Sequence, residues 1–98
     1  MSGMNNSIMP AYCVCVLRSR KDGLFYLGYT TNIVRRFAEH AEGKSASTAP
    51  RRPFDLLYCE HHTDKYDALR RERYFKTSVG KRMLKLILAD ALKRTLPI

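Results

Sequence analysis

A tyrosine, a glycine, an arginine and a histidine follow one another at short distances in the first half of this chain. They are Tyr26, Gly28, Arg36 and His40. Tyrosine and histidine can hold or move protons, and arginine can pair with a phosphate through two parallel hydrogen bonds. A glycine near a tyrosine on one strand leaves room for a ligand or a backbone to approach closely. The set therefore points to a site that acts on phosphate.

Helical geometry predicts that the arginine and the histidine face the sheet. At about 100° per residue, Arg36 and His40 fall on the inner, apolar side of a helix, whereas Arg35 points to solvent. A basic side chain on the inner side is unfavourable unless it meets an anion. A bound phosphate would satisfy Arg36. The alternative is that Arg36 binds backbone carbonyls or a buried acid, and that His40 is an ordinary half-buried histidine.

Further along the chain, Glu72 occupies an inward position on a second predicted helix. It falls on the same side as Ala68 and Phe75, among apolar residues. A lone inward carboxylate needs a cation, either an arginine or a bound metal ion. The sequence leaves both possibilities open, an internal salt bridge with Arg36 or Arg71 and a metal site.

The composition is that of a small, basic, globular chain. Its 98 residues are 45% hydrophobic and include 18 Lys and Arg against 9 Asp and Glu, a formal net charge of +9. This charge predicts attraction to polyanions, with nucleic acid first and an anionic membrane surface second. No apolar run approaches the roughly 18 residues that span a bilayer. We therefore expect a nucleic-acid partner and no membrane partner.

The cysteines and the N-terminal residues bear on the compartment. Cys13, Cys15 and Cys59 are odd in number and lack the spacing of zinc ligands. Residues 1–10 have neither the basic start nor the apolar core of a signal peptide. These features favour a reducing cytosol, and we expect a cytoplasmic protein.

The elements that must position these residues predict a small α+β domain. Strands are expected at residues 12–17, 24–29 and 54–60, and helices at residues 32–42, 64–76 and 81–93. We expect a three-stranded antiparallel sheet flanked by helices, in the order β-β-α-β-α-α. Residues 1–11 would form a flexible tail and residues 12–94 a single domain.

Turn and cap residues set the expected boundaries. Asp22-Gly23 is a hairpin signal between the first two strands. Thr30 or Thr31 is expected to cap the first helix, and Asp64 or Thr63 the second. Residues 77–80 would separate the last two helices, and Pro97 would end the chain's helical part. The last helix is basic and amphipathic, which fits either a lid on the core or a membrane-surface helix, and its periodicity favours the lid.

These residues resemble the signature of the GIY-YIG nuclease superfamily, over nearly the whole chain. Tyr26-Leu27-Gly28 resembles the second signature tripeptide, Arg36 and His40 resemble the helix motif, and Glu72 resembles the metal-binding glutamate. More narrowly, the chain is similar to small standalone bacterial members of the UPF0213 or excinuclease-subunit-C-like type. Their Tyr-hydrophobic-Gly-Tyr-Thr, Arg-Arg-Pro and Arg-Glu-x-x-x-Lys elements recur at residues 26–30, 51–53 and 71–76.

One position departs from the superfamily pattern. The first signature tripeptide ends in tyrosine, but its counterpart here is Cys13-Val14-Cys15, so that Cys15 stands where the tyrosine is expected. A thiol reproduces neither the reach nor the hydrogen bonding of a phenol. The alternative to an active nuclease is therefore a nucleic-acid-binding module with impaired catalysis.

The resemblance implies a metal-dependent endonuclease acting on nucleic acid, DNA before RNA, with low sequence specificity, as in DNA repair. Glu72 would hold one Mg²⁺ or Mn²⁺ ion, Arg36 would pair with the scissile phosphate, and Tyr26 would orient or deprotonate water. His40 would relay a proton or hold Tyr26. The residues expected to bind substrate are Gly28, Thr30, Lys44, Arg51 and Arg52. The sequence leaves the oligomeric state open.

Overall fold

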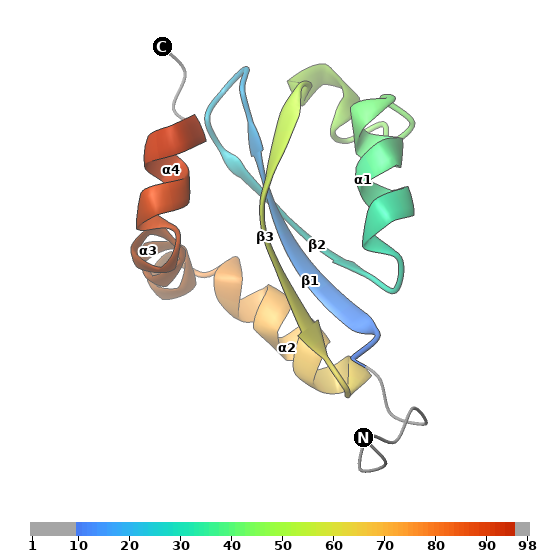
Figure 1. Cartoon of the computed structure of the whole chain (residues 1–98), viewed down its shortest axis with the longest axis vertical. Helices are drawn as coiled ribbons and strands as arrows, with labels where there is room; N and C mark the ends of the chain where they lie inside the picture. The colour runs from blue at the N-terminus through green and yellow to red at the C-terminus, as the bar shows by residue number, and fades with distance from the viewer. Residues whose placement is uncertain (1–9, 96–98) are drawn as a thin grey trace, which may run out of the picture.

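The computed structural model describes residues 10–95 and contains a three-stranded antiparallel sheet between two layers of helices (Figure 1). The strands are β1 (Tyr12–Ser19), β2 (Phe25–Thr30) and β3 (Phe54–His62), in the order β2-β1-β3. The helices are α1 (Ile33–Ala41), α2 (Lys65–Phe75), α3 (Ser78–Ile87) and α4 (Ala89–Thr95), with a short 3-10 turn η1 (Ala49–Arg51) before β3. α1 covers one face of the sheet and α2, α3 and α4 cover the other (Figure 1). The predicted α+β class and sheet are confirmed.

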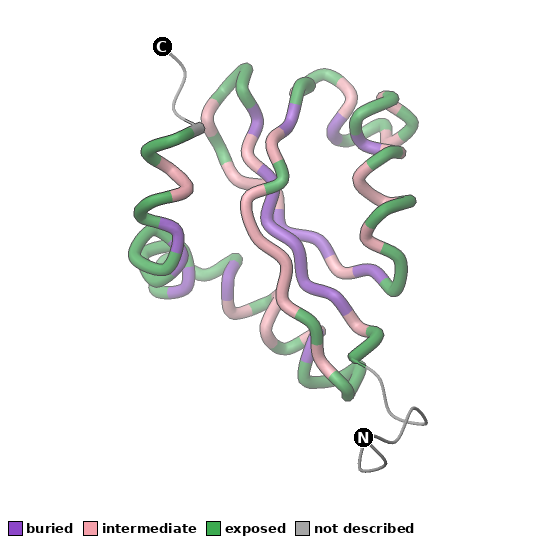
Figure 2. The backbone as a smooth tube through the Cα atoms, viewed as in Figure 1, coloured by how far each residue is buried: buried purple, intermediate pink, exposed green. Residues whose placement is uncertain are grey.

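The central strand β1 is buried on both faces, as its unbroken apolar run predicts. Val14 and Val16 pack into the core beneath α2 and α3. Cys13, Cys15 and Leu17 pack into a second core beneath α1. Figure 2 shows this burial as a continuous stretch along β1 between the two helix layers. The sheet therefore has helices on both sides while remaining only three strands wide.

The hairpin between β1 and β2 turns at the predicted Asp22-Gly23 pair. Gly23 has a φ of 73°, a left-handed conformation that glycine adopts readily. The Asp22 carboxylate accepts a hydrogen bond from the Leu24 amide at 2.9 Å, and the Ser19 amide donates to the Leu24 carbonyl at 3.0 Å. These bonds close the turn and fix the point at which β2 begins.

The N-cap of the first helix lies one residue after Thr31, the later of the two predicted caps. The Asn32 side chain accepts from the Arg35 amide at 3.1 Å and is the N-cap of α1. Neither Thr30 nor Thr31 takes this role, because the Thr30 hydroxyl accepts instead from the Asn32 amide at 3.0 Å. The prediction for α2 is confirmed, since Asp64 caps that helix.

The segment at residues 77–80 begins a helix, which corrects the prediction that it would interrupt the helical part. The Thr77 hydroxyl caps α3 by accepting from the Gly80 amide at 3.0 Å. Gly80 lies inside α3 and is buried against the Tyr74 carbonyl at the end of α2. The glycine is therefore a contact residue between two helices. The single helix predicted at residues 81–93 is divided at Leu88 into α3 and α4.

The inner face of α3 is a lid on the core, as its periodicity favours. Leu84 and Leu88 are buried in the same cluster as Phe75. Within residues 10–95, the structure contains no helix long and apolar enough to cross a membrane. The predicted tail falls mostly on residues 1–9, which lie outside the described residues, as does Pro97. The division into tail and single domain stays a prediction.

Replacing Gly80 by alanine is expected to destabilise the protein, although alanine is the better helix former by about 1 kcal/mol. The added methyl group would overlap the Tyr74 carbonyl, so α3 would have to move away from α2. We expect the free energy of unfolding in urea to fall by about 1–3 kcal/mol. The matched control is Val79→Ala at an exposed neighbour, with a change within about 0.5 kcal/mol. A Gly80→Ala protein as stable as the parent would contradict this close packing.

Candidate active site

A cleft with a volume of about 350 Å³ lies along the outer edge of β2. α1 and α2 pack on opposite faces of the sheet, yet each contributes side chains to this cleft. The lining residues are Phe25, Tyr26, Leu27, Gly28 and Tyr29 of β2, Arg36 of α1, Glu72 of α2, and Lys76 and Lys81 from the end of α2 and from α3. The cleft therefore straddles the sheet edge, and four of the predicted site residues meet there.

Gly28 keeps the floor of this cleft open. It is paired with Cys15 across the β1–β2 ladder. A Cβ atom at position 28 would lie 3.1 Å from the Cys15 sulfur and 3.5 Å from a ring carbon of Tyr26. A side chain there would press on the Cys15 sulfur and fill the space beside the tyrosine ring, so glycine preserves that space.

Arg36 reaches the cleft from the α1 side with its side chain 37% exposed. Its Nη1 atom lies 3.4 Å from a Glu39 carboxylate oxygen. Burial acts to lower the pKa of Arg36, but interaction with the Tyr26 hydroxyl and the Glu39 carboxylate holds that pKa above its ordinary value. The guanidinium is therefore charged, adjacent to Tyr26 and open to an anion from the cleft.

Glu72 reaches the cleft from the opposite face of the sheet. Its side chain is only 17% exposed, and the nearest cation is the Lys76 ammonium at 3.9 Å. The internal salt bridges considered as alternatives do not form in the described residues, because Arg71 pairs with Glu60 at 2.8 Å and Arg36 pairs with Glu39. A half-buried carboxylate with one distant partner retains free oxygen lone pairs toward the cleft.

His40 lies behind Tyr26 and is fully buried. Its Nδ1 atom is 2.7 Å from the Thr48 hydroxyl oxygen, and its Nε2 atom has no hydrogen-bond partner within residues 10–95. The imidazole meets the Tyr26 ring edge-on, with 4.8 Å between ring centroids. Burial, together with the charge of Arg36, lowers the pKa of His40. A neutral imidazole therefore supports the back of the tyrosine ring.

Cys15 lies beside Gly28, next to the cleft but not among its lining residues, and is a neutral thiol. It is buried and free, between Gly28 on one neighbouring strand and Cys59 on the other. Burial and the neighbouring Cys59 raise the pKa of Cys15 to about 11. The thiol therefore supplies neither the length nor the acidity of a phenol at this position.

Four residues expected to bind substrate lie elsewhere in the structure. The Thr30 hydroxyl is engaged with the Asn32 backbone, and the Lys44 ammonium pairs with Glu42 at 3.2 Å. Arg52 donates to the Ala49 carbonyl at 2.9 Å. None of these three lines the cleft in the part of the chain that the structure describes. Arg51 pairs with Asp22 and lines a neighbouring groove.

Five lining residues were not among the predicted site residues: Phe25, Leu27, Tyr29, Lys76 and Lys81. Lys76 had a signal in the sequence, because it follows Glu72 by one helical turn and shares its side. Phe25 and Tyr29 alternate with Tyr26 and Gly28 along β2 and so belong to the opposite face of the strand. Lys81 had no local signal, since its place depends on how α3 packs against α2.

The donor set at this cleft fits one hard cation held by a single carboxylate. No group of three or more His, Cys, Asp or Glu side chains able to hold a metal occurs among residues 10–95. Glu72 presents carboxylate oxygens beside open space. Mg²⁺ and Mn²⁺ accept such a site when waters and phosphate oxygens complete their coordination.

Comparison with known proteins gives a family and several relatives. The family model described as the GIY-YIG catalytic domain matches residues 11–85. A UPF0213 protein of Staphylococcus haemolyticus is 46% identical over 68 residues, which cover 68% of this chain and 83% of that protein. A UPF0213 protein of Streptococcus agalactiae is 44% identical over 69 residues, 69% of this chain and 76% of that protein.

A solved structure is also similar. The solution NMR structure of a UPF0213 protein from Bacillus halodurans matches with a TM-score of 0.55 and 33% sequence identity. The match covers 86% of this chain and 93% of that chain. The likeness therefore extends over the sheet and the helices that form the cleft.

The buried His40 predicts a pH dependence of stability. Because its pKa is lower in the folded protein than the ordinary 6.5, the unfolded chain takes up the proton first as the pH falls. The stabilisation that comes from a neutral His40 is then fully present above about pH 6.5. Below that pH the free energy of unfolding falls, by at most about 1.4 kcal/mol per pH unit. Urea unfolding between pH 7.5 and 5 should show a smaller slope for His40→Gln than for the parent. The exposed-site control His61→Gln should keep the parental slope, and an unchanged slope in His40→Gln would contradict the prediction.

Proposed function

We propose, since this chain belongs to the GIY-YIG catalytic domain family, that it hydrolyses phosphodiester bonds in nucleic acid, with DNA as the expected substrate and little sequence specificity. The observation that carries the proposal is the meeting of Arg36 and Glu72 at one sheet edge from opposite faces of the sheet. A formal net charge of +9 supports a polyanionic partner. The family match supports a nuclease-like fold, and a guanidinium together with a carboxylate that could hold a cation are groups that phosphoryl transfer can use.

Arg36 binds the scissile phosphate in this proposal. Its planar guanidinium can donate two parallel hydrogen bonds to non-bridging oxygens, a geometry that lysine cannot copy. Tyr26 lies beside Arg36 and orients the attacking water or takes its proton. His40 holds the tyrosine ring from behind, since it is buried and touches Tyr26. Lys76 adds positive charge on the Glu72 side of the same cleft.

Glu72 would hold one divalent ion, Mg²⁺ or Mn²⁺, through its cleft-facing carboxylate. Such an ion, when bound, neutralises charge that develops on the phosphate and the leaving oxygen. The contribution of Glu72 itself is to hold the ion within reach of a phosphate that Arg36 positions. Because the carboxylate is half-buried, its interaction with a cation is screened less than at an open surface.

Glu72→Gln is the direct test of this proposal. The amide keeps the shape of the carboxylate but loses its charge, so cleavage of branched, nicked or linear DNA with Mg²⁺ or Mn²⁺ should fall on the order of 100-fold or more. Gel analysis of end-labelled substrates measures the rate. The control is Glu42→Gln, an exposed carboxylate beyond α1, which should cut at the parental rate. Equal cleavage by Glu72→Gln and the parent would refute the nuclease proposal.

A second candidate function is a nucleic-acid-binding module with impaired catalysis. The observation that favours it is Cys15, which is buried, neutral and too short to enter the cleft. In this case Arg36 and the lysines of the cleft would still bind phosphate. The two candidates differ in turnover and agree on the ligand.

Cys15→Tyr distinguishes the candidates further. A tyrosine at position 15 could pass over its cross-strand partner Gly28, which has no side chain, and reach the cleft. If the missing phenol limits turnover, cleavage should rise on the order of 100-fold, the lower end of the contribution that general acid–base catalysis makes. Cys15→Ala is the control and should leave the rate unchanged. No gain in the folded Cys15→Tyr protein, judged by circular dichroism, would show that Cys15 is not the limiting difference.

A further inference from the structure

A second groove, of about 310 Å³, adjoins the cleft at the tip of the β1–β2 hairpin. Its lining residues are Gly23, Leu24, Phe25, Arg51, Lys81 and Lys85. Phe25 and Lys81 also line the cleft that contains Arg36 and Glu72. Because these two residues line both the cleft and the second groove, the two hollows form one continuous path along the hairpin and α3.

Phe25 stands at the junction of these two hollows. It is the first residue of β2 and only partly buried against the core beneath α3. The hairpin below it is anchored by Arg51, whose Nε atom donates to Asp22 at 3.0 Å and whose Nη2 atom donates to the Leu24 carbonyl at 3.3 Å. The aromatic ring is therefore held in a fixed place with one part facing the path.

Lys81 and Lys85 supply the positive charge along the path. They lie one turn apart on α3 and both are exposed. Neither ammonium pairs with a carboxylate of residues 10–95, in contrast to Lys76 and Lys93. Arg51 differs from them, because its guanidinium is already engaged with Asp22. The two lysines are thus available to an anionic ligand.

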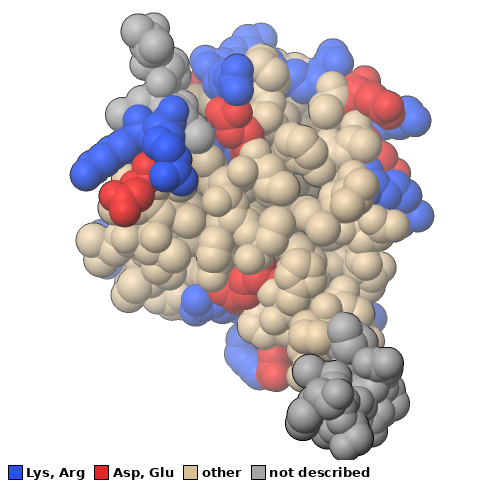
Figure 3. All heavy atoms as spheres, in the orientation of Figure 1, with Lys and Arg blue, Asp and Glu red and all other residues tan. Residues whose placement is uncertain are grey.

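An aromatic ring and unpaired cations in a narrow groove are what single-stranded nucleic acid binds, through base stacking and backbone contacts. A continuous duplex offers no free base face to a ring, because its bases are stacked on one another. By contrast, the face seen in Figure 3 carries its Lys and Arg around the margin, and its centre over β3 is mostly uncharged. The centre of that face therefore offers no basic patch comparable with the two lysines along the hairpin and α3.

We propose that Phe25, Lys81 and Lys85 bind a single-stranded flank of the substrate next to the scissile phosphate. Phe25 stacks on a base, and the two lysines contact backbone phosphates. The inference rests on the proposed function for the position of the scissile phosphate at Arg36 and Glu72. It names the substrate class as nucleic acid with an unpaired segment on one side of the cleavage point.

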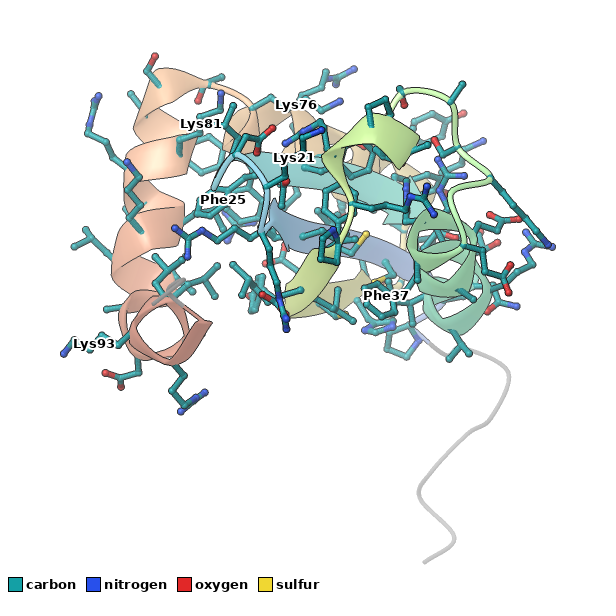
Figure 4. All side chains as sticks on the ribbon, turned by 90° about the horizontal axis from the view of Figure 1, so that it is seen from above. Lys21, Phe25, Phe37, Lys76, Lys81 and Lys93 are labelled. Carbon is teal, nitrogen blue, oxygen red and sulfur yellow. The ribbon has the colours of Figure 1, made fainter. Side chains whose placement is uncertain are left out.

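The test is binding of a fluorescent oligothymidine, measured by anisotropy in EDTA, where no cleavage occurs. Phe25→Leu removes the ring and should raise Kd roughly 5- to 100-fold, whereas Phe25→Tyr should keep the parental Kd. Phe37→Leu is the matched control, since Phe37 belongs to α1, packs against the core beneath that helix and lies apart from Phe25 and Lys81 in Figure 4. Circular dichroism confirms that each variant is folded.

A second pair of variants tests the charges independently of the ring. Lys81→Gln should reduce the slope of log Kd against log salt by about 0.7, the value for one phosphate contact on a single strand. Lys93→Gln should leave the slope unchanged, because Lys93 lies on α4 away from Phe25 and Lys81 (Figure 4). The affinity of Phe25→Leu for a blunt duplex should differ little from that of the parent. Comparing oligouridine with oligothymidine shows whether RNA or DNA is the preferred single strand.

The proposal is overturned if Phe25→Leu and Lys81→Gln bind the single strand as their controls do. It is also overturned if Phe25→Leu weakens the blunt duplex as much as the single strand. Because binding is measured without metal, loss of the nuclease proposal would leave this result intact. The converse result is cleavage that depends on Glu72 while Phe25→Leu binds as the parent does. That result would refute the proposed role of the groove and leave the proposed nuclease function standing.

Discussion

The narrowness of the sheet is the constraint on which the site depends. β1 has one neighbour on each side, so β2 forms an edge, and helices on opposite faces can both reach that edge. Gly28 makes the approach possible, because a side chain there would fill the space between Cys15 and Tyr26. A further strand beside β2 would separate Arg36 from Glu72. The position of the cleft is therefore a consequence of the sheet topology. Its chemistry is set by the side chains that reach the β2 edge, above all Arg36 and Glu72.

Charge in the cleft is held in place by few internal partners. Arg36 is paired with Glu39 and meets Tyr26, and Glu72 has only Lys76 at 3.9 Å. Charges left this open inside a half-buried cleft cost stability unless a ligand meets them. The two cores on either side of β1 provide the stability that tolerates this arrangement. Arg36 and Glu72 line the same cleft without forming a salt bridge with each other, so together they suit a ligand that carries both a phosphate and a metal ion.

The sequence predicted the parts of the structure that depend on local pattern. Periodicity placed Glu72 and His40 inward, and Asp22-Gly23 marked the hairpin, because these signals need only neighbouring residues. Gly80 shows the limit, since a residue that usually interrupts a helix is required here by contact with Tyr74. The positions of Phe25 and Lys81 depend on how α3 packs beside the hairpin. Such a contact between distant segments leaves no mark in either segment alone.

The central claim is that Glu72 holds a metal ion at the β2 edge, within reach of Arg36. Paramagnetic broadening by Mn²⁺ tests this directly in the presence of a short oligonucleotide, through the backbone amide signals of a nitrogen-15-labelled protein. The account predicts broadening of the Gly28 and Tyr29 amides at the edge and of Arg36 across it, with loss of all three effects in Glu72→Gln. Broadening centred elsewhere, or unchanged in Glu72→Gln, would contradict it.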